Sequence, residues 1–235
     1  MANNKTGIEW TDKTWNPTTG CDKISTGCQH CYAEEMTKRF PNGFSSGFDV
    51  TLHESRLKTP LKWRKASKVF VNSMSDLFHD KVPYDFIDKV METISKADKH
   101  IFQVLTKRPE RMRDYFETCY NKPLPDNLWL GVSVENQNYV NRIDYLKKVP
   151  AKVRFLSCEP LLGDLELDLT DIHWVIVGGE SGNKYRPIKE EWVLHIKEQC
   201  ELANVAFFFK QWGGYTPKAK GRLLQGKEYN QFPQL

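Results

Sequence analysis

The stretch from residue 68 to residue 106 reads KVFVNSMSDLFHDKVPYDFIDKVMETISKADKHIFQVLT. Its two ends, residues 69–73 and 101–106, are short apolar runs rich in valine, isoleucine and phenylalanine, which is typical of buried strands. Between them, residues 83–97 carry apolar side chains from Phe86 to Ile94 at the spacing of one helix face. The stretch therefore predicts a strand–helix–strand unit, the building block of a parallel sheet.

The same alternation continues on both sides of this unit. Further strands are expected at residues 128–134, 153–157, 174–177 and 206–210, with a first strand within residues 8–15. Further helices are expected at residues 32–39, 109–119, 136–148 and 188–203. The sequence thus predicts an α/β fold of six to seven βα units. Its hydrophobic pattern fits both a doubly wound sheet and a full or partial (β/α) barrel.

Length and composition set the expected domain organisation and compartment. We expect residues 1–235 to form a single domain, with residues 42–68 as an insertion and residues 213–235 as a polar C-terminal extension. No apolar run approaches the roughly 20 residues of a membrane helix, and the polar start lacks a secretory pattern. The prediction is a cytoplasmic protein without membrane contact. The 34 basic and 30 acidic residues give a net charge of +4, which permits nucleic-acid binding without arguing for it.

Residues 20–34, GCDKISTGCQHCYAE, gather three of the six cysteines, Cys21, Cys28 and Cys31, with the spacing C-x6-C-x2-C. In a reducing compartment such a cluster more often binds metal or performs redox chemistry than forms disulfides. A structural zinc site normally needs four protein ligands, and His30, directly before Cys31, is poorly placed to be the fourth. A 4Fe–4S cluster can instead be held by three thiolates, which leaves one iron open. The remote candidates for a fourth zinc ligand are His53, Cys119, Cys158 and Cys200.

A cysteine loop after the first strand of such a fold resembles the radical S-adenosylmethionine superfamily, whose members are full or partial (β/α) barrels. The superfamily spacing is usually C-x3-C-x2-C, so the longer first gap here is expected to bulge outward. The resemblance implies a 4Fe–4S cluster on Cys21, Cys28 and Cys31, with S-adenosylmethionine on its open iron. It also implies an enzyme that forms a 5′-deoxyadenosyl radical, and a reductant such as flavodoxin or ferredoxin as partner.

A narrower resemblance covers nearly the whole chain. Its segments resemble a phage- and mobile-element-associated family of unknown function, which is similar in motif placement to spore photoproduct lyase. This resemblance implies a phage protein and a nucleotide or DNA base as substrate, with the reaction itself unknown. The segments are IEWTDKTWNPTTGC, GCQHCYAE, NSMSDLFH, LTKRPERM, LGVSVEN, FLSCEPLLG, VIVGGESG, RPIKEEWV, FFFKQWGG and GRLLQGKEYNQFP.

The superfamily resemblance also indicates cofactor-binding residues at three strand ends. After the second strand, a polar loop holds the methionine amine of the cofactor, which implies this role for Ser73, Ser75 and Asp76, although the same residues suit a helix cap. After the fourth strand, Ser133 and Glu135 are expected to bind the cofactor carboxylate or ribose. Lys107 and Arg108 follow the third strand, where they suit the cofactor carboxylate, a substrate phosphate or a solvated loop.

Two acidic residues are expected on the substrate side of the site. Glu159 follows the strand at 153–157 and precedes a proline, which favours an extended backbone at the mouth of the sheet. Glu180 lies in GGESG after the next strand, and Arg186, which follows it, is expected on the substrate side as well. With Lys107, these two glutamates are the predicted catalytic residues.

The competing hypothesis is a zinc-dependent nucleic-acid-binding module without catalytic activity. It would use the cysteine loop as a structural site, and basic charge around Trp63 as a contact for a nucleic-acid strand. The alternative interpretation of that charge is a solvated face over a core tryptophan. The basic residues concerned are Arg56, Lys58, Lys62, Arg64, Lys65 and Lys68.

Overall fold

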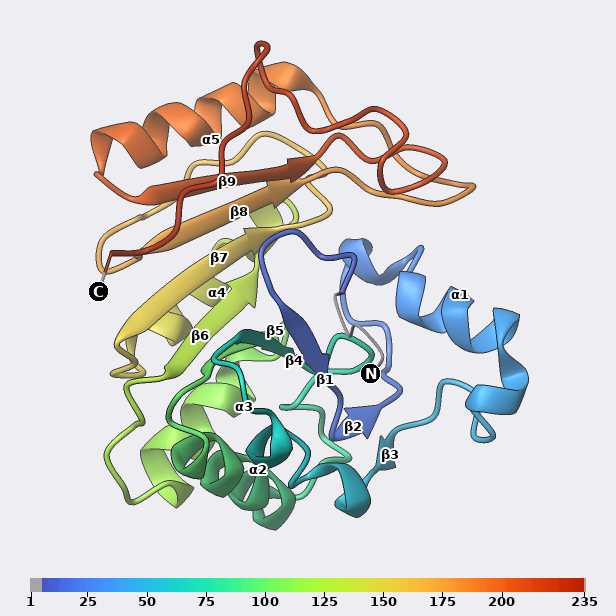
Figure 1. Cartoon of the computed structure of the whole chain (residues 1–235). Coiled ribbons are helices and arrows are strands. Elements are labelled where there is room, and N and C mark those ends of the chain that lie inside the picture. The colour runs from blue at the N-terminus through green and yellow to red at the C-terminus, as the bar shows by residue number, and fades with distance from the viewer. Residues whose placement is uncertain (1–5, 235) are drawn as a thin grey trace.

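In the computed structural model, which describes residues 6–234, seven parallel strands form a half-barrel (Figure 1). The strands follow one another in chain order across the sheet, so each strand pairs with the next along the chain. The ends of the expected domain, residues 1–5 and 235, lie outside the described residues. The strands are β1 (Lys13–Trp15), β4 (Lys68–Val71), β5 (Ile101–Thr106), β6 (Leu128–Ser133), β7 (Val153–Cys158), β8 (Trp174–Gly178) and β9 (Ala206–Gln211).

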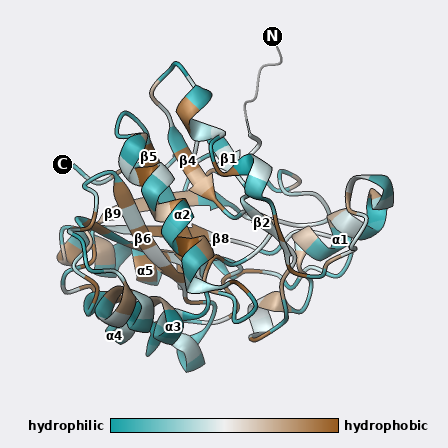
Figure 2. Cartoon of the chain, turned by 90° about the horizontal axis from the view of Figure 1, so that it is seen from below, coloured by the Kyte–Doolittle hydropathy of each residue, from teal (hydrophilic) through white to brown (hydrophobic). Residues whose placement is uncertain are grey.

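Helices cover the outer, convex face of the sheet. They are α2 (Tyr84–Lys96), α3 (Pro109–Asp114), α4 (Arg142–Lys147) and α5 (Glu190–Leu202), whereas α1 (Tyr32–Arg39) stands beside the carboxyl ends of the strands (Figure 1). Val69 and Val71 of β4 face the helix side and belong to the larger core, as do Phe86 and Val90 of α2. Figure 2 shows this arrangement as apolar strands flanked by helices with hydrophilic outer faces. Along residues 6–234, no helix is long and apolar enough to cross a membrane.

The concave face has a core of its own, built from aromatic residues. Phe70, between the two valines of β4, points to this side and stacks on Trp10 with ring centroids 4.7 Å apart. Trp174 of β8 contacts Trp10, Trp129, Phe155, Phe208 and Phe232. Large side chains therefore fill the concave face, as is usual in close-packed protein interiors.

The expected strands and helices are largely confirmed, with three corrections at their bounds. The first strand is only Lys13–Trp15, because the preceding segment turns Trp10 into the concave core. The helix expected at 109–119 ends at Asp114 and continues as one π-helical turn, Tyr115–Cys119. The helix expected at 136–148 spans only Arg142–Lys147, because the Asn136 side chain accepts from the Asn138 amide and caps a separate 3₁₀ turn.

The expected insertion and the expected C-terminal extension both contact the rest of the fold. The insertion at 42–68 consists of 3₁₀ turns and of β3 (Thr51–Leu52), which pairs antiparallel with β2 (Thr18–Thr19), and its last residue, Lys68, begins β4. The C-terminal extension packs along β9, where Gln231 accepts a hydrogen bond from the Phe207 amide at 2.8 Å. The extension is therefore part of the concave core as well as a polar tail.

Candidate active site

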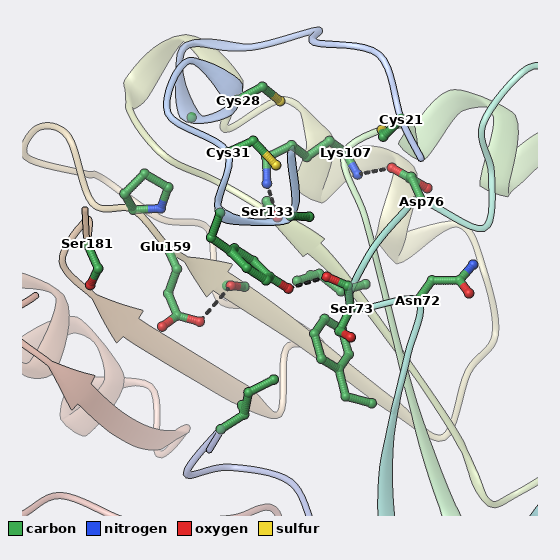
Figure 3. A pocket seen from close by; sticks show the side chains of 18 of the residues that line it. Cys21, Cys28, Cys31, Asn72, Ser73, Asp76, Lys107, Ser133, Glu159 and Ser181 are labelled. Atoms are coloured by element: carbon green, nitrogen blue, oxygen red, sulfur yellow. Dashed lines mark hydrogen bonds between the residues drawn. The ribbon is translucent and has the colours of Figure 1, made fainter. Parts of the chain in front are cut away.

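A cavity of about 490 Å³ lies at the carboxyl ends of the parallel strands. That end of a (β/α) barrel is where active sites of this architecture are found, and the volume is typical of small-molecule sites. Cys21, Cys28 and Cys31 all line it. Figure 3 shows the three cysteines along its upper side and Glu159 below them.

The cysteine loop, residues 20–31, begins at Gly20, which is held between the loops that contain Phe48 and Met74. Gly20 has a φ of +85°, and a Cβ there would lie 2.1 Å from the Asp49 carbonyl oxygen, so only glycine fits. After β5, Arg108 donates to the Cys21 sulfur at 3.4 Å and to the buried Asp76 carboxylate at 3.3 Å. Arg108 thereby places the first cysteine against the sheet.

A second anchor is the fully buried Glu135, after β6. Its Oε1 accepts from the Ser25 hydroxyl at 2.6 Å, and its Oε2 pairs with Arg142 at 2.7 Å. A Cβ at Gly27 would lie 2.4 Å from Oε1, so the loop backbone rests directly on this carboxylate. Burial would raise the pKa of Glu135, but Lys107 and Arg142 hold that pKa below its ordinary value. The carboxylate is therefore a stable, charged acceptor for the loop.

The third anchor is Glu180, after β8, which is buried and paired with Arg186. His30, inside the cysteine loop, lies 3.3 Å from Glu180 Oε2 through its Nδ1. Arg186 also donates to the Thr26 carbonyl oxygen at 3.0 Å and to the Gln29 side chain at 3.3 Å. The loop is thus held by the ends of three different strands.

The expected outward bulge is only half correct. Residues 22–24 are exposed, as expected for an extended first gap. Residues 25–27, however, dock on the loop after β6: Thr26 accepts from the Asn136 amide group at 2.9 Å and its own amide donates to the Tyr139 hydroxyl at 3.2 Å. The additional residues therefore supply contacts that fix the loop to the sheet.

The three thiols stand in different electrostatic surroundings. Burial and Asp76 raise the pKa of Cys21 to about 11, against the effect of Arg108. For Cys28, burial acts in the same direction, but Lys107 and the Ser25 hydroxyl bring the pKa below its ordinary value. Lys107 thus favours the thiolate, the form that binds metal, at Cys28, whereas burial and Asp76 favour the protonated thiol at Cys21.

The donor set fits a 4Fe–4S cluster held by three thiolates. The other cysteines are elsewhere: Cys119 is exposed on the π-helical turn, whereas Cys158 and Cys200 are buried in the core, where burial raises their pKa. Within residues 6–234, no three histidine, cysteine or acidic side chains, the loop cysteines included, lie close enough together to hold a metal ion. Cys21, Cys28 and Cys31 nevertheless line one cavity, and three thiolates are the number that a 4Fe–4S cluster with one open iron requires.

The loop after β4 is more constrained than expected. Asp76 accepts four hydrogen bonds, from the amides of Phe78 and Lys107, the Thr106 hydroxyl and Arg108. Ser73 accepts a hydrogen bond at its carbonyl oxygen from the hydroxyl of Tyr32, the residue after the third cysteine (Figure 3). The predicted binding of a cofactor amine by Ser73, Ser75 and Asp76 stays a prediction, although all three line the cavity.

The floor of the cavity carries an ion pair at the ends of β7 and β9. Lys210 Nζ lies 3.1 Å from Glu159 Oε1, and the Ser157 hydroxyl donates to Oε2 at 3.3 Å. Glu159 Oε1 is buried and has no hydrogen-bond partner among the described residues, so its contact with Lys210 is an ion pair without a hydrogen bond. Trp10 and Phe70 form the apolar surface beside this pair.

The predicted site residues are brought together, with one exception. Lys107, Arg108, Ser133, Glu159 and Glu180 line the cavity as the order of the strands predicts, whereas Glu135 lies beneath the cysteine loop. Their roles as catalytic or cofactor-binding groups stay predictions. Sequence reasoning missed Ser25, Gly27, Arg142 and Ser157. Ser157 could have been found from its place at the carboxyl end of a strand. Ser25, Gly27 and Arg142 act through contacts between distant segments, and such contacts leave no local pattern in the sequence.

Comparison with known proteins assigns the family. A family model described as DUF5131, protein of unknown function, matches residues 5–233. The chain belongs to the DUF5131 family. Among curated proteins, none matches the sequence of this DUF5131 chain.

Solved structures similar to this DUF5131 protein are those of spore photoproduct lyase. One mutant of that enzyme has a TM-score of 0.58 at 12% sequence identity, over 85% of this chain and 76% of the lyase chain. The lyase complexed with dinucleoside spore photoproduct has a TM-score of 0.50 at 13% identity, over 72% of this chain. The match spans only 56% of the lyase chain in that complex. The likeness establishes the fold, a half-barrel like that of spore photoproduct lyase.

Proposed function

We propose that this DUF5131 protein is a radical S-adenosylmethionine-type enzyme with a 4Fe–4S cluster on Cys21, Cys28 and Cys31. The observation that carries the proposal is the position of these three thiols, on one anchored loop at the carboxyl end of a half-barrel. The cluster and S-adenosylmethionine, when bound, would supply one-electron reduction and hydrogen-atom abstraction, with the electron drawn from a reductant such as flavodoxin or ferredoxin.

The residues of the chain divide into three tasks in this proposal. Glu135, Glu180 and Arg108 position the cysteine loop through the contacts described above. The polar groups between the loop and the sheet, Ser73, Ser75, Asp76 and Ser133, face the cofactor. Glu159 and Lys107 are the groups we assign to the substrate, since each lines the cavity with a charge and is hydrogen-bonded to a serine at a strand end, Ser157 of β7 and Ser133 of β6.

A nucleotide or a DNA base is the substrate class that we propose. The support is the likeness to a lyase whose structure holds a dinucleoside spore photoproduct, together with the apolar, aromatic cavity wall of Trp10 and Phe70. A planar base packs well on such a wall, and the Glu159–Lys210 pair offers an acceptor and a donor to its edge. The cytoplasmic place and the phage origin of the protein stay predictions.

The test is anaerobic reconstitution with iron and sulfide, followed by addition of S-adenosylmethionine and dithionite. The proposal predicts reductant-dependent 5′-deoxyadenosine, which should be lost in Cys28→Ala. Cys119→Ala is the matched control, because Cys119 is an exposed thiol away from the cavity, and it should leave the yield unchanged. Formation of 5′-deoxyadenosine by Cys28→Ala would contradict the ligand assignment.

The zinc-dependent binding module gives the opposite result in the same experiment. It predicts one tightly bound zinc ion per chain, no brown colour after reconstitution and no cleavage of S-adenosylmethionine. The two hypotheses are therefore separated by metal analysis alone.

A further inference from the structure

Two loops extend side by side beyond the ends of β8 and β9 (Figure 1). Ser181 and Gly214 form a parallel bridge between them, and the Gly182 amide donates to the Gly214 carbonyl oxygen at 2.9 Å. Residues 181–189 and 212–222 therefore make one surface, which we call the basic rim.

The basic rim carries positive charge and no acidic residue. Its basic residues are Lys184, Arg186, Lys189, Lys218, Lys220 and Arg222, and neither segment contains aspartate or glutamate. Arg186, Lys189, Lys218 and Arg222 each pair with a glutamate outside the two segments. Lys184 and Lys220 are exposed and have no ion-pair partner among the described residues. Exposed cations on adjacent loops attract a polyanion, such as the phosphodiester backbone of a nucleic acid.

Aromatic side chains stand among these lysines. Tyr215 is 67% exposed, and Tyr185 lies under the Lys220 ammonium group, 5.0 Å from its ring centroid. The apolar ring surface of an exposed tyrosine is unfavourably hydrated and has no core contact, but a nucleobase can stack on it and remove that surface from water. Lysine with tyrosine is the combination that proteins use for single-stranded nucleic acid.

The basic rim borders the cavity directly. Ser181 and Pro217 belong both to the rim and to the cavity wall, and Lys218 lies 3.4 Å from Glu9, another wall residue. The cavity lining also includes Ile24 and Met36, which are apolar and each 43% exposed. Basic and apolar side chains therefore both border the cavity, which matches a nucleotide with its phosphate and its base.

We propose that the basic rim binds the sugar-phosphate backbone of a single nucleic-acid strand and presents one unstacked base to the cavity. A base inside a duplex cannot reach a cavity of this kind without leaving the stack, so the strand must be single or locally opened. The chemistry in the cavity rests on the proposed function, but binding of the strand does not.

The other basic cluster, around Trp63, provides a matched control. Trp63 packs edge-to-face against His100, directly before β5, and Lys68 begins β4, so this cluster lies at the amino ends of the strands, opposite the cavity. Replacing Lys58, Lys62 and Lys65 removes the same charge as replacing Lys184, Lys218 and Lys220.

The experiment measures binding of a fluorescein-labelled 20-nucleotide DNA strand to the full reconstituted chain by fluorescence anisotropy across a salt series. An RNA strand of the same sequence and the DNA duplex serve as further probes. The triple variant K184A/K218A/K220A should weaken binding of the strand about tenfold or more, and should reduce the salt slope by about 2, since each lost phosphate contact contributes about 0.7. Tyr215→Ala should weaken it about fivefold or more, and Tyr215→Phe should bind like the wild type.

The triple variant K58A/K62A/K65A should bind within about twofold of the wild type, corrected for net charge. Equal losses in both triple variants would overturn the proposal, because they would show an effect of overall charge. Failure of the wild-type protein to bind either strand, or tighter binding of the duplex, would also overturn it. None of these binding measurements depends on the formation of 5′-deoxyadenosine. A protein that binds the strand but does not cleave S-adenosylmethionine would therefore contradict the proposed function and still support strand binding by the basic rim.

Discussion

At the scale of single residues, Arg108 links the sheet to the cysteine loop. Its guanidinium group contacts the Cys21 sulfur, the Asp76 carboxylate and the Asp22 carbonyl oxygen, and only 8% of the residue is exposed. A planar, always charged group with several donors can hold a thiolate and a carboxylate at once, which a lysine cannot do in the same geometry.

We therefore predict that Arg108→Gln lowers the free energy of unfolding by about 3 kcal/mol, because it leaves the buried Asp76 without its cation. The matched control is Arg113→Gln, whose ion pairs with Asp114 and Glu117 lie at the surface and should cost less than about 1 kcal/mol. Urea unfolding of both variants without metal provides the measurement. Equal stability losses would show that the Arg108 pair is no stronger than a surface pair.

The Glu159–Lys210 pair gives a second prediction at this scale. Because both side chains are mostly buried, we expect a double-mutant cycle with Glu159→Gln and Lys210→Met to yield a coupling energy of about 1 kcal/mol. The pair Lys152–Asp126 has the same 3.1 Å separation but is exposed, so its cycle should give almost none. Additive effects of Glu159→Gln and Lys210→Met on urea unfolding would contradict the buried ion pair.

At the scale of elements, the sequence predicts the strands well and the cysteine loop poorly. The strand at Ile101–Thr106 and helix α1 have the predicted bounds, because hydrophobic period and helix-breaking residues are local signals. The docking of residues 25–27 depends on Glu135, more than a hundred positions later, and no local pattern carries that information. Glu135 itself was expected beside the cofactor, because nothing in the sequence around it indicates its contact with the cysteine loop.

The cysteine loop gives a prediction that depends on the absence of a Cβ at Gly27. An alanine Cβ at position 27 would lie 2.4 Å from Glu135 Oε1, an atom already fixed by Ser25, so the loop must shift. We predict that Gly27→Ala reduces the iron bound after reconstitution severalfold and costs about 1–3 kcal/mol of stability. Gly43→Ala is the control, since nothing lies within 4 Å of its Cβ, and wild-type iron content is expected.

If Gly27→Ala bound as much iron as Gly43→Ala, the contact with Glu135 would not position the cysteine loop. Iron and sulfide are quantified per chain after gel filtration, so the result does not depend on turnover.

At the scale of the whole molecule, the order of the strands is what assembles the site. Each parallel strand ends at the same edge, so residues from position 21 to position 210 meet in one cavity. The sequence predicts this convergence, because strand ends are recognisable one by one. It does not predict a half-barrel rather than a doubly wound sheet, since that depends on how the aromatic side chains of the concave face pack together.

The proposed 4Fe–4S cluster has three thiolate ligands and one open iron. The most direct test is the electron paramagnetic resonance spectrum of the reconstituted, dithionite-reduced protein, recorded with and without S-adenosylmethionine. We predict the signal of a reduced 4Fe–4S cluster whose g-values shift when S-adenosylmethionine is added. An absent iron–sulfur signal, or one that S-adenosylmethionine leaves unchanged, would contradict the account.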